Sequence, residues 1–447
     1  MNKTQPTAAP TDTATTDHAP PPAHGNRRLA HWFVTAPRKP LFWIVVLAIV
    51  LRLPGLGWGL PASDGWDDDG VAPRNFLVGL ALTYVPGSFF TYPPLHMLWL
   101  TLLNLPVVGI ALAHAPAYSQ QAVIGTFIHV PYMTSFAFTA RALSLLMSVG
   151  TVLLVNRLTS LVAGPLAGLL AAAACALDGG LVYYGQVTNL DGPYLFWAVL
   201  SLWAWMRFLI AGDLRSLRWA ALSAAAAIAT KDQAYAVFLL TLPASFLLSL
   251  ALDPAARRRF PTLVLPMLRW ASISLGLLLL VDGAITNPSG FTRRMAFLRG
   301  PASQDYMAYT ADIAGRVRLV ADMIAHFPRF YPAVTALLAV AGLVLMWRST
   351  RAQPALRVAG LVPLLAALSF TLFFNMLALR TDNRFLLPQS LFIAPYIGLG
   401  CAWLLGLRRP ALRLAAQAGL AGLAATALWH CAGLDAAMLN DPRYDAE

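Results

Sequence analysis

Long apolar runs separated by short polar segments dominate the sequence from Pro40 onward. Three of these runs contain no Asp, Glu, Lys or Arg: Leu161–Leu177, Leu361–Leu379 and Leu414–Trp429. About 20 apolar residues in a helix cross the ~30 Å hydrocarbon core of a bilayer, and a helix satisfies its own backbone hydrogen bonds there. The pattern therefore predicts an all-α polytopic integral membrane protein with about eleven transmembrane helices of near-spanning length.

Short clusters of arginine between the apolar runs predict the side of the membrane on which each loop lies. The first run is preceded by four basic residues, Arg27, Arg28, Arg38 and Lys39. Cytoplasmic loops carry an excess of Lys and Arg, so the N-terminus is predicted to be cytoplasmic. If the run Leu95–Ala113 crossed the membrane, nearly all later clusters would face outward, against this rule. We therefore predict that Leu95–Ala113 forms juxtamembrane helices within a first external loop, residues 61–133.

The same pattern predicts the domain organisation. We expect a disordered basic cytoplasmic tail at residues 1–39, a transmembrane domain at residues 40–432 and a short external tail at residues 433–447. The chain is 58% apolar and 12% charged, whereas soluble domains are about 45–50% apolar and roughly 25% charged. The net charge of +12 does not indicate binding to nucleic acid, because the arginines lie between apolar runs, where topology explains them.

The most acidic stretch of the chain lies in the first external loop, at Asp64 and Asp67-Asp68-Asp69. Three adjacent carboxylates repel one another, which raises the pKa of at least one of them unless a cation lies among them. A carboxylate with a raised pKa can act as general base on a hydroxyl, and a group of carboxylates can bind a divalent metal ion. A solvated loop that caps a helix is the alternative interpretation.

Other ionisable residues near the membrane are candidates for function, because burying a charge in a bilayer is costly. Asp191 begins a long apolar run, where it either serves a site or caps the helix. Lys231 ends a run of small residues, where it either contacts a phosphate or extends its amine to the interface. Arg384 lies on the external side against the charge rule, and Arg141 lies within a helix; an anionic partner would account for both.

Seven motifs occur in order along the chain: Leu51-Arg52-Leu53, Asp67-Asp68-Asp69, Tyr92-Pro93-Pro94-Leu95-His96, Arg141-Ala142-Leu143-Ser144, Tyr183-Tyr184 with Asp191-Gly192-Pro193, Ala229-Thr230-Lys231 and Arg384-Phe385-Leu386-Leu387-Pro388. Their order and predicted side resemble the GT-C superfamily of membrane glycosyltransferases, especially the protein O-mannosyltransferase and lipid A aminoarabinose transferase types. That family places its Pro-Pro helix on the external surface, in agreement with the position predicted from charge.

The resemblance implies roles for particular residues. Asp68 would be the general base on the acceptor hydroxyl, with Asp69 beside it as second acid and Asp67 as an alternative base. Asp191 would be the acid of the second loop. A divalent metal ion, the only cofactor implied, would be held by Asp68 and Asp191. Five residues would contact the lipid phosphate or the donor: Arg141, Lys231, Arg384, Tyr92 and His96.

The activity implied is transfer of a sugar from a polyprenyl-phosphate-linked donor to a hydroxyl of a glycolipid, polysaccharide or protein, with inversion at the anomeric carbon. The resemblance and the Arg- and Ala-rich composition favour a bacterial inner membrane, with the active site in the periplasm. A transporter or flippase for a lipid-linked or small anionic substrate is the main alternative, although no internal repeat is visible in the sequence. A family member without catalysis is a third interpretation, which the intact acid cluster disfavours.

Overall fold

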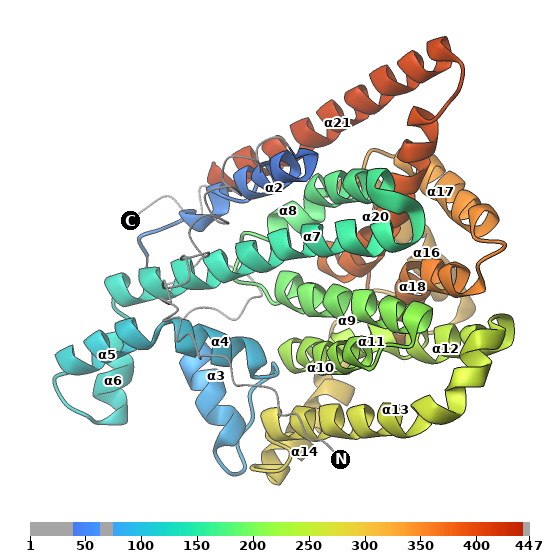
Figure 1. Ribbon diagram of the computed structural model, residues 1–447. Helices are drawn as coiled ribbons and strands as arrows, with labels where there is room; N and C mark the ends of the chain where they lie inside the picture. Colours follow the sequence, from blue (N-terminus) through green and yellow to red (C-terminus); the bar gives the residue numbers. More distant parts are fainter. Residues whose placement is uncertain (1–38, 63–74, 441–447) are drawn as a thin grey trace, which may run out of the picture. The chain divides into compact units, whose positions relative to one another are not determined.

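The computed structural model describes residues 39–62 and 75–440 of the chain. The described residues from Ile44 onward form one compact unit, which Figure 1 draws as a bundle of helices. The contacts given below lie within it. Every regular element there is a helix, which confirms the all-α prediction. Seven described helices have the length and composition of a membrane span, and a bent pair would make an eighth. The multi-pass membrane prediction is confirmed, and the number of about eleven spans stays a prediction.

The longer helices are, in chain order, α2 (Pro40–Val50), α7 (Val130–Ala176), α9 (Asp191–Ala211), α10 (Leu214–Thr230), α12 (Thr241–Leu252), α13 (Pro254–Val281), α17 (Thr335–Ser349), α18 (Pro354–Phe370), α20 (Asn383–Leu405) and α21 (Pro410–Leu439). Each of them overlaps an apolar run from which a helix was predicted. Helix α21 continues to Leu439, past the residue at which the external tail was predicted to begin.

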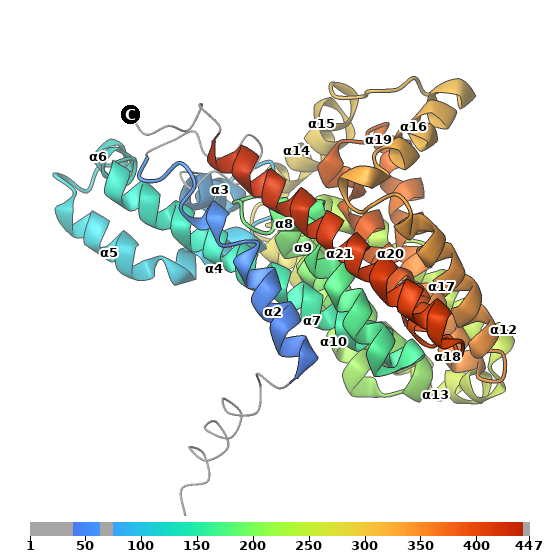
Figure 2. The same cartoon turned by 90° about the horizontal axis from the view of Figure 1, so that it is seen from above.

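Further helical segments, of 3 to 13 residues, lie between these helices: η2 (Pro54–Leu56), α3 (Asn75–Tyr84), α4 (Leu95–Leu103), α5 (Leu105–His114), α6 (Gln120–Phe127), α8 (Gly179–Tyr184), η3 (Asp232–Ala234), α11 (Tyr235–Phe238), α14 (Pro288–Arg299), α15 (Pro301–Gln304), α16 (Ile313–Ala325), η4 (Phe327–Arg329), η5 (Thr371–Asn375) and α19 (Met376–Ala378). Figures 1 and 2 show α3, α4 and α14 at the same end of the bundle, where α9 begins and α10 and α13 end. That end carries the candidate site.

Helix α7 is a hairpin of two arms. Its Gly164 has a φ of 82° and a ψ of 170°, a conformation that residues with a side chain rarely adopt, and Pro165 follows. Arg52 bonds both arms, because its Nε donates to Ser148 Oγ at 2.8 Å and its Nη1 to the carbonyl oxygen of Ala176 at 3.4 Å. A straight helix would separate those two residues by roughly 42 Å. The arms therefore run antiparallel, as predicted for two consecutive spans.

Small residues let the central helices approach one another closely. Gly398 of α20 packs against α7, where a Cβ atom would collide with the backbone of Ala171. Gly342 of α17 packs against α20 in the same way, beside the carbonyl oxygen of Tyr396. Lipid tails are as apolar as leucine, so helices in a membrane associate through close packing and hydrogen bonds. These contacts fix the bundle that holds the site.

The run predicted to lie at the membrane surface forms two short helices, α4 and α5, which are bent by 67° relative to each other. Asn104 joins them, and Pro106 lies in the first turn of α5. Helix α4 has 9 residues and α5 has 10, whereas a span takes about 20. No Asp, Glu, Lys or Arg occurs from Asn75 to Ala140, as suits a segment in contact with lipid. Its location at the external surface stays a prediction.

Candidate active site

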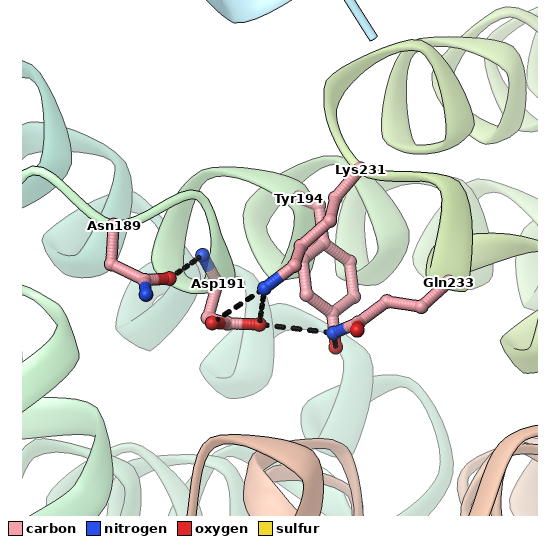
Figure 3. A network of polar contacts seen from close by, with 5 residues as sticks. All are labelled: Asn189, Asp191, Tyr194, Lys231 and Gln233. Carbon is pink, nitrogen blue, oxygen red and sulfur yellow. Dashed lines mark hydrogen bonds and ion pairs between the residues drawn. The ribbon is translucent and has the colours of Figure 1, made fainter. Parts of the chain in front are cut away.

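A buried ion pair joins Asp191, the first residue of α9, to Lys231, the residue that follows α10 (Figure 3). The Nζ atom of Lys231 donates to both carboxylate oxygens of Asp191 at 2.8 Å. Asp191 is fully buried and Lys231 is 7% exposed. The amine of Lys231 therefore does not extend to the interface, and the partner that the structure gives it is a carboxylate.

Two amide side chains complete the surroundings of Asp191. Gln233 of η3 donates from Nε2 to Asp191 Oδ1 at 3.0 Å and to the hydroxyl of Tyr194 at 3.3 Å. The Oδ1 atom of Asn189 accepts the backbone N–H of Asp191 at 2.7 Å. Figure 3 shows the carboxylate directed at Lys231 and Gln233. A buried ion pair is tolerated when further hydrogen bonds satisfy its remaining polar atoms, and Gln233 supplies one of these bonds.

A second group of charges begins at the next residue. Asp232 pairs with Arg294 of α14, and Arg294 Nη1 lies 3.6 Å from Oδ2 of Asp282, at the end of α13. Arg294 is 3% exposed. Burial raises the pKa of Asp282 to about 7; the positive charge of Arg294 opposes this shift, and the negative charge of Asp232 adds to it. The two groups are adjacent in the chain, because Lys231 and Asp232 are consecutive residues.

The acids of the first external loop, Asp64, Asp67, Asp68 and Asp69, lie outside the described residues. The chain that leads to them is held by the first arm of α7. Arg141 Nη1 donates to the carbonyl oxygens of Trp58 at 2.6 Å and of Leu56 at 3.4 Å. Thr134 Oγ1 accepts the backbone N–H of Ala62 at 3.2 Å. Arg141 is fully buried, and these bonds fix the backbone just before the acidic loop.

Tyr92 lies within electrostatic reach of the Asp191 pair. Burial raises the pKa of Tyr92 to about 12, and the negative charges of Asp191 and Asp232 add to the shift. His96, on α4, is fully buried. In the described part of the chain, neither ring nitrogen of His96 has a hydrogen-bond partner. Tyr92 packs against an apolar cluster that contains Leu190, the residue before Asp191, so the structure brings Tyr92 close to the ion pair.

Arg384 lies in the first turn of α20, with its guanidinium 4.6 Å from the centroid of the Phe385 ring. Tyr184 of α8 connects this region with the ion pair. Burial raises the pKa of Tyr184, and the negative charges of Asp191 and Asp382 add to the shift. Gly180 of α8 packs against Leu387 in the first turns of α20, so the start of α20 lies on the same side of the bundle as α8 and the start of α9. A role for Arg384 in phosphate binding stays a prediction.

Three residues that were not predicted from the sequence contribute to the site: Gln233, Tyr194 and Arg294. Gln233 follows Lys231 by two positions, so a longer motif around Lys231 would have included it. Tyr194 follows Asp191 by three positions, which places both side chains on one face of α9. Arg294 is 62 residues from its partner Asp232, and nothing in the sequence connects the two.

The predicted metal ion is not tested by the described residues. Within them, no group of three or more His, Cys, Asp or Glu side chains is arranged to hold a metal ion. Asp191 is engaged by Lys231 and Gln233, and Asp68 lies outside the described residues. A metal ion held by Asp68 and Asp191 stays a prediction.

An apolar groove of about 410 Å³ lies between α10, α12 and α13. Alanines of α10 form one wall, and Phe246 and Met267 lie on the others. Ile228 and Leu278 also line the groove; each lies about one helical turn before a charged residue of the site, Lys231 and Asp282 respectively. The groove therefore ends beside the two groups of charges.

The arrangement of helices is similar to that of two solved structures, an ArnT protein and an oligosaccharyltransferase, which confirms the fold expected from the motifs. One similar structure is ArnT from Cupriavidus metallidurans bound to undecaprenyl phosphate, with a TM-score of 0.53 and 15% identity, covering 92% of this chain and 75% of that one. Another is the Archaeoglobus fulgidus oligosaccharyltransferase in complex with zinc and sulfate, with a TM-score of 0.55 and 13% identity, covering 90% of this chain and 53% of that one.

The sequence itself matches no protein-family model and no curated protein. At identities of 13% and 15%, the similarity to solved structures concerns the fold. The chain spans about half the length of the archaeal oligosaccharyltransferase, 53%. The activity of this chain is therefore argued below from its own residues.

Proposed function

We propose that this protein transfers a sugar from a polyprenyl-phosphate-linked donor to an acceptor hydroxyl, at the periplasmic face of a bacterial inner membrane. The observation that carries the proposal is the buried Asp191–Lys231 pair with Gln233, set at one end of a bundle with the GT-C fold. Two further observations support a lipid-linked donor. The apolar groove ends about one turn from Lys231, and a structure with this fold holds undecaprenyl phosphate.

Asp68 is the proposed general base, with Asp69 beside it and Asp67 as the alternative. The acceptor oxygen attacks the anomeric carbon from the side opposite the lipid phosphate. The new carbon–oxygen bond forms as the bond from the anomeric carbon to the phosphate oxygen breaks, so the configuration inverts. The hydroxyl proton passes to the carboxylate, and the electron pair of the broken bond stays on the lipid phosphate.

Negative charge develops on the departing lipid phosphate, and a cation placed there lowers the barrier. Arg384 is our candidate, because it lies at the start of α20 on the side of Asp191 and a guanidinium binds phosphate oxygens in pairs. Lys231 is proposed to hold Asp191, to which it donates, and Arg141 to hold the backbone before the acidic loop. Both are proposed to keep the acids of the two loops in place for the reaction.

Asp191 is proposed to shape the site together with Tyr92, whose phenol lies within reach of its charge. If a divalent metal ion takes part, Asp68 and Asp191 are the residues that would hold it. The carboxylate of Asp191 would then have to share its oxygens between the metal ion and Lys231. Donor binding in the membrane would bring the sugar to the acids, which supplies the proximity that the transfer needs.

The lipids that co-purify with the protein test this proposal. Asp68→Asn removes the base and leaves the donor contacts, so a polyprenyl-phosphate sugar should be enriched in this variant over the wild type. Mass spectrometry of the extracted lipids measures the enrichment and identifies the sugar. Asp305→Asn, at an exposed acid beyond α15, is the matched control and should show the wild-type lipid content. Absence of any isoprenoid phosphate from all three preparations would contradict the proposal and favour a transporter.

A further inference from the structure

Helix α14 is fastened to residues 83–88, which comprise the end of α3 and the segment that follows it. The side chain of Asn287, just before α14, donates from Nδ2 to the carbonyl oxygens of Val85 and Ser88, both at 2.8 Å. Its Oδ1 accepts the backbone N–H of Gly87 at 2.9 Å. Asn287 is 1% exposed, so these bonds are shielded from water. Helix α14 is therefore tied firmly to the part of the first external loop that the structure describes.

Two consecutive arginines of α14 have different partners. Arg293 Nη1 donates to the carbonyl oxygen of Gly87 at 2.6 Å and so strengthens the attachment to residues 83–88. Arg294 instead pairs with Asp232 and approaches Asp282. Arg293 is exposed and Arg294 is buried. Successive side chains on a helix diverge by about 100°, which accounts for the two directions.

The partner of Arg294 is the residue next to Lys231. Lys231 has an extended backbone, with φ −150° and ψ 124°, and it connects α10 to η3. The side chain of Lys231 reaches Asp191, and that of Asp232 reaches Arg294. A buried ion pair and a partly buried one thus fix neighbouring side chains at the end of α10. Removing Arg294 would leave Asp232 without its cation and free this turn to move.

We propose that Arg294 is a positioning residue: by holding Asp232 it fixes the turn at Lys231 and so keeps Lys231 on Asp191. Because α14 is also tied to residues 83–88, Arg294 links the first external loop to the Asp191–Lys231 pair. The assignment of this pair to a reaction rests on the proposed function. The positioning itself does not, because it concerns contacts that exist without any substrate.

Lysine-specific labelling measures the position of Lys231 directly. Lys231 is the only lysine after Lys39 in the chain, so mass spectrometry of the labelled protein follows one site in the bundle. In the wild type, the buried and ion-paired amine should react slowly. In Arg294→Gln the rate should rise about 5-fold to 30-fold, the range that loss of one buried interaction produces in an equilibrium. Arg294→Lys retains a cation and should restore slow labelling, the introduced lysine being distinguished by its fragment masses.

The control is Arg293→Gln, which changes the neighbouring arginine and breaks the bond to Gly87 without touching Asp232. This variant should label at the wild-type rate. If Arg294→Gln fails to fold, Asp232→Asn tests the same contact from the other side and should also accelerate labelling. An unchanged rate in the variants of Arg294 and Asp232 would overturn the proposal. So would an equal rise in Arg293→Gln, since that result would mean general loosening of α14. None of these readouts requires transferase activity.

Discussion

Charged side chains beside the candidate site are satisfied largely by other groups of the chain. Arginines predicted to lie on the external side oppose the charge rule, and an anionic ligand was one expected explanation. The structure supplies another for several of them, because Arg293, Arg316 and Arg380 donate to the carbonyl oxygens of Gly87, Met376 and Ala302. A guanidinium carries five donors in a planar fork, so one arginine can fasten two segments of loop. These residues are explained by the external loops that they hold together.

Lys231→Met tests the buried ion pair between Asp191 and Lys231. Methionine has a similar length and no charge, so the carboxylate of Asp191 loses its cation while still buried. Breaking a buried ion pair on one side typically costs about 3–5 kcal/mol of stability, and we expect a loss of this size in thermal unfolding in detergent. The double variant Asp191→Asn with Lys231→Met removes both charges and should recover most of the loss. Equal stability of the single variant and the wild type would show that the pair is not formed.

Asp282 should make stability depend on pH. Its pKa in the folded protein is about 7, above the ordinary value of 3.8, because burial disfavours the carboxylate. The folded state therefore binds this proton more tightly than the unfolded state does. The contribution to stability is full below about pH 4 and is lost as the pH rises through about 7.

Asp282→Asn removes this dependence on pH, because asparagine does not titrate. The unfolding temperature of the variant, relative to that of the wild type, should rise between about pH 5 and about pH 8. Thermal unfolding at both values, in the same detergent, measures the difference. A difference that stays constant with pH would mean that Asp282 keeps the same protonation state in the folded and unfolded proteins.

At the scale of helices, the sequence predicted the positions of the helices well and the positions of the turns between them less well. The apolar runs were long enough to cross a bilayer, so each produced a helix close to its predicted place. Polar residues interrupt the apolar sequence of α7 at Asn156 and Arg157, but the turn between its two arms does not lie there. It occurs at Gly164, because the Gly164-Pro165 pair can leave the helical conformation and Arg157 remains helical. Polarity marks the membrane boundary, whereas backbone freedom determines where the chain turns.

Gly164→Ala tests the turn of α7. At a φ of 82° and a ψ of 170° a Cβ atom is strained, at a cost of about 1–3 kcal/mol. The variant should unfold at a lower temperature than the wild type. Gly419→Ala is the control, because Gly419 lies within α21 and a Cβ there meets no neighbour within 4 Å. Its expected effect is a gain of up to about 1 kcal/mol. An equal change of unfolding temperature in Gly164→Ala and Gly419→Ala would contradict the hairpin of α7.

At the scale of the whole molecule, the sequence predicted the fold class. The motifs identified Asp191 and Lys231 separately, and their direct contact needed the fold, because 40 residues separate them. Arg294 could not be found at all from the sequence. The positioning role of Arg294 depends on its contacts with Asp232 and Asp282. The three residues come together only when α10, α13 and α14 pack. The acids at 67–69 lie outside the described residues, so their role stays a proposal.

Turnover of the lipid-linked donor tests the central claim most directly. The polyprenyl-phosphate sugar identified in the Asp68→Asn preparation would be added to wild-type protein in vesicles of the native membrane, whose lipids, polysaccharides and proteins supply the acceptor hydroxyl, and release of polyprenyl phosphate would be followed. The account predicts release by the wild type and by Asp305→Asn, and a loss of roughly 100-fold or more in Asp68→Asn, the size expected for removal of a general base. Release at the wild-type rate by Asp68→Asn would contradict the assigned base. No release by the wild type would contradict the transferase itself.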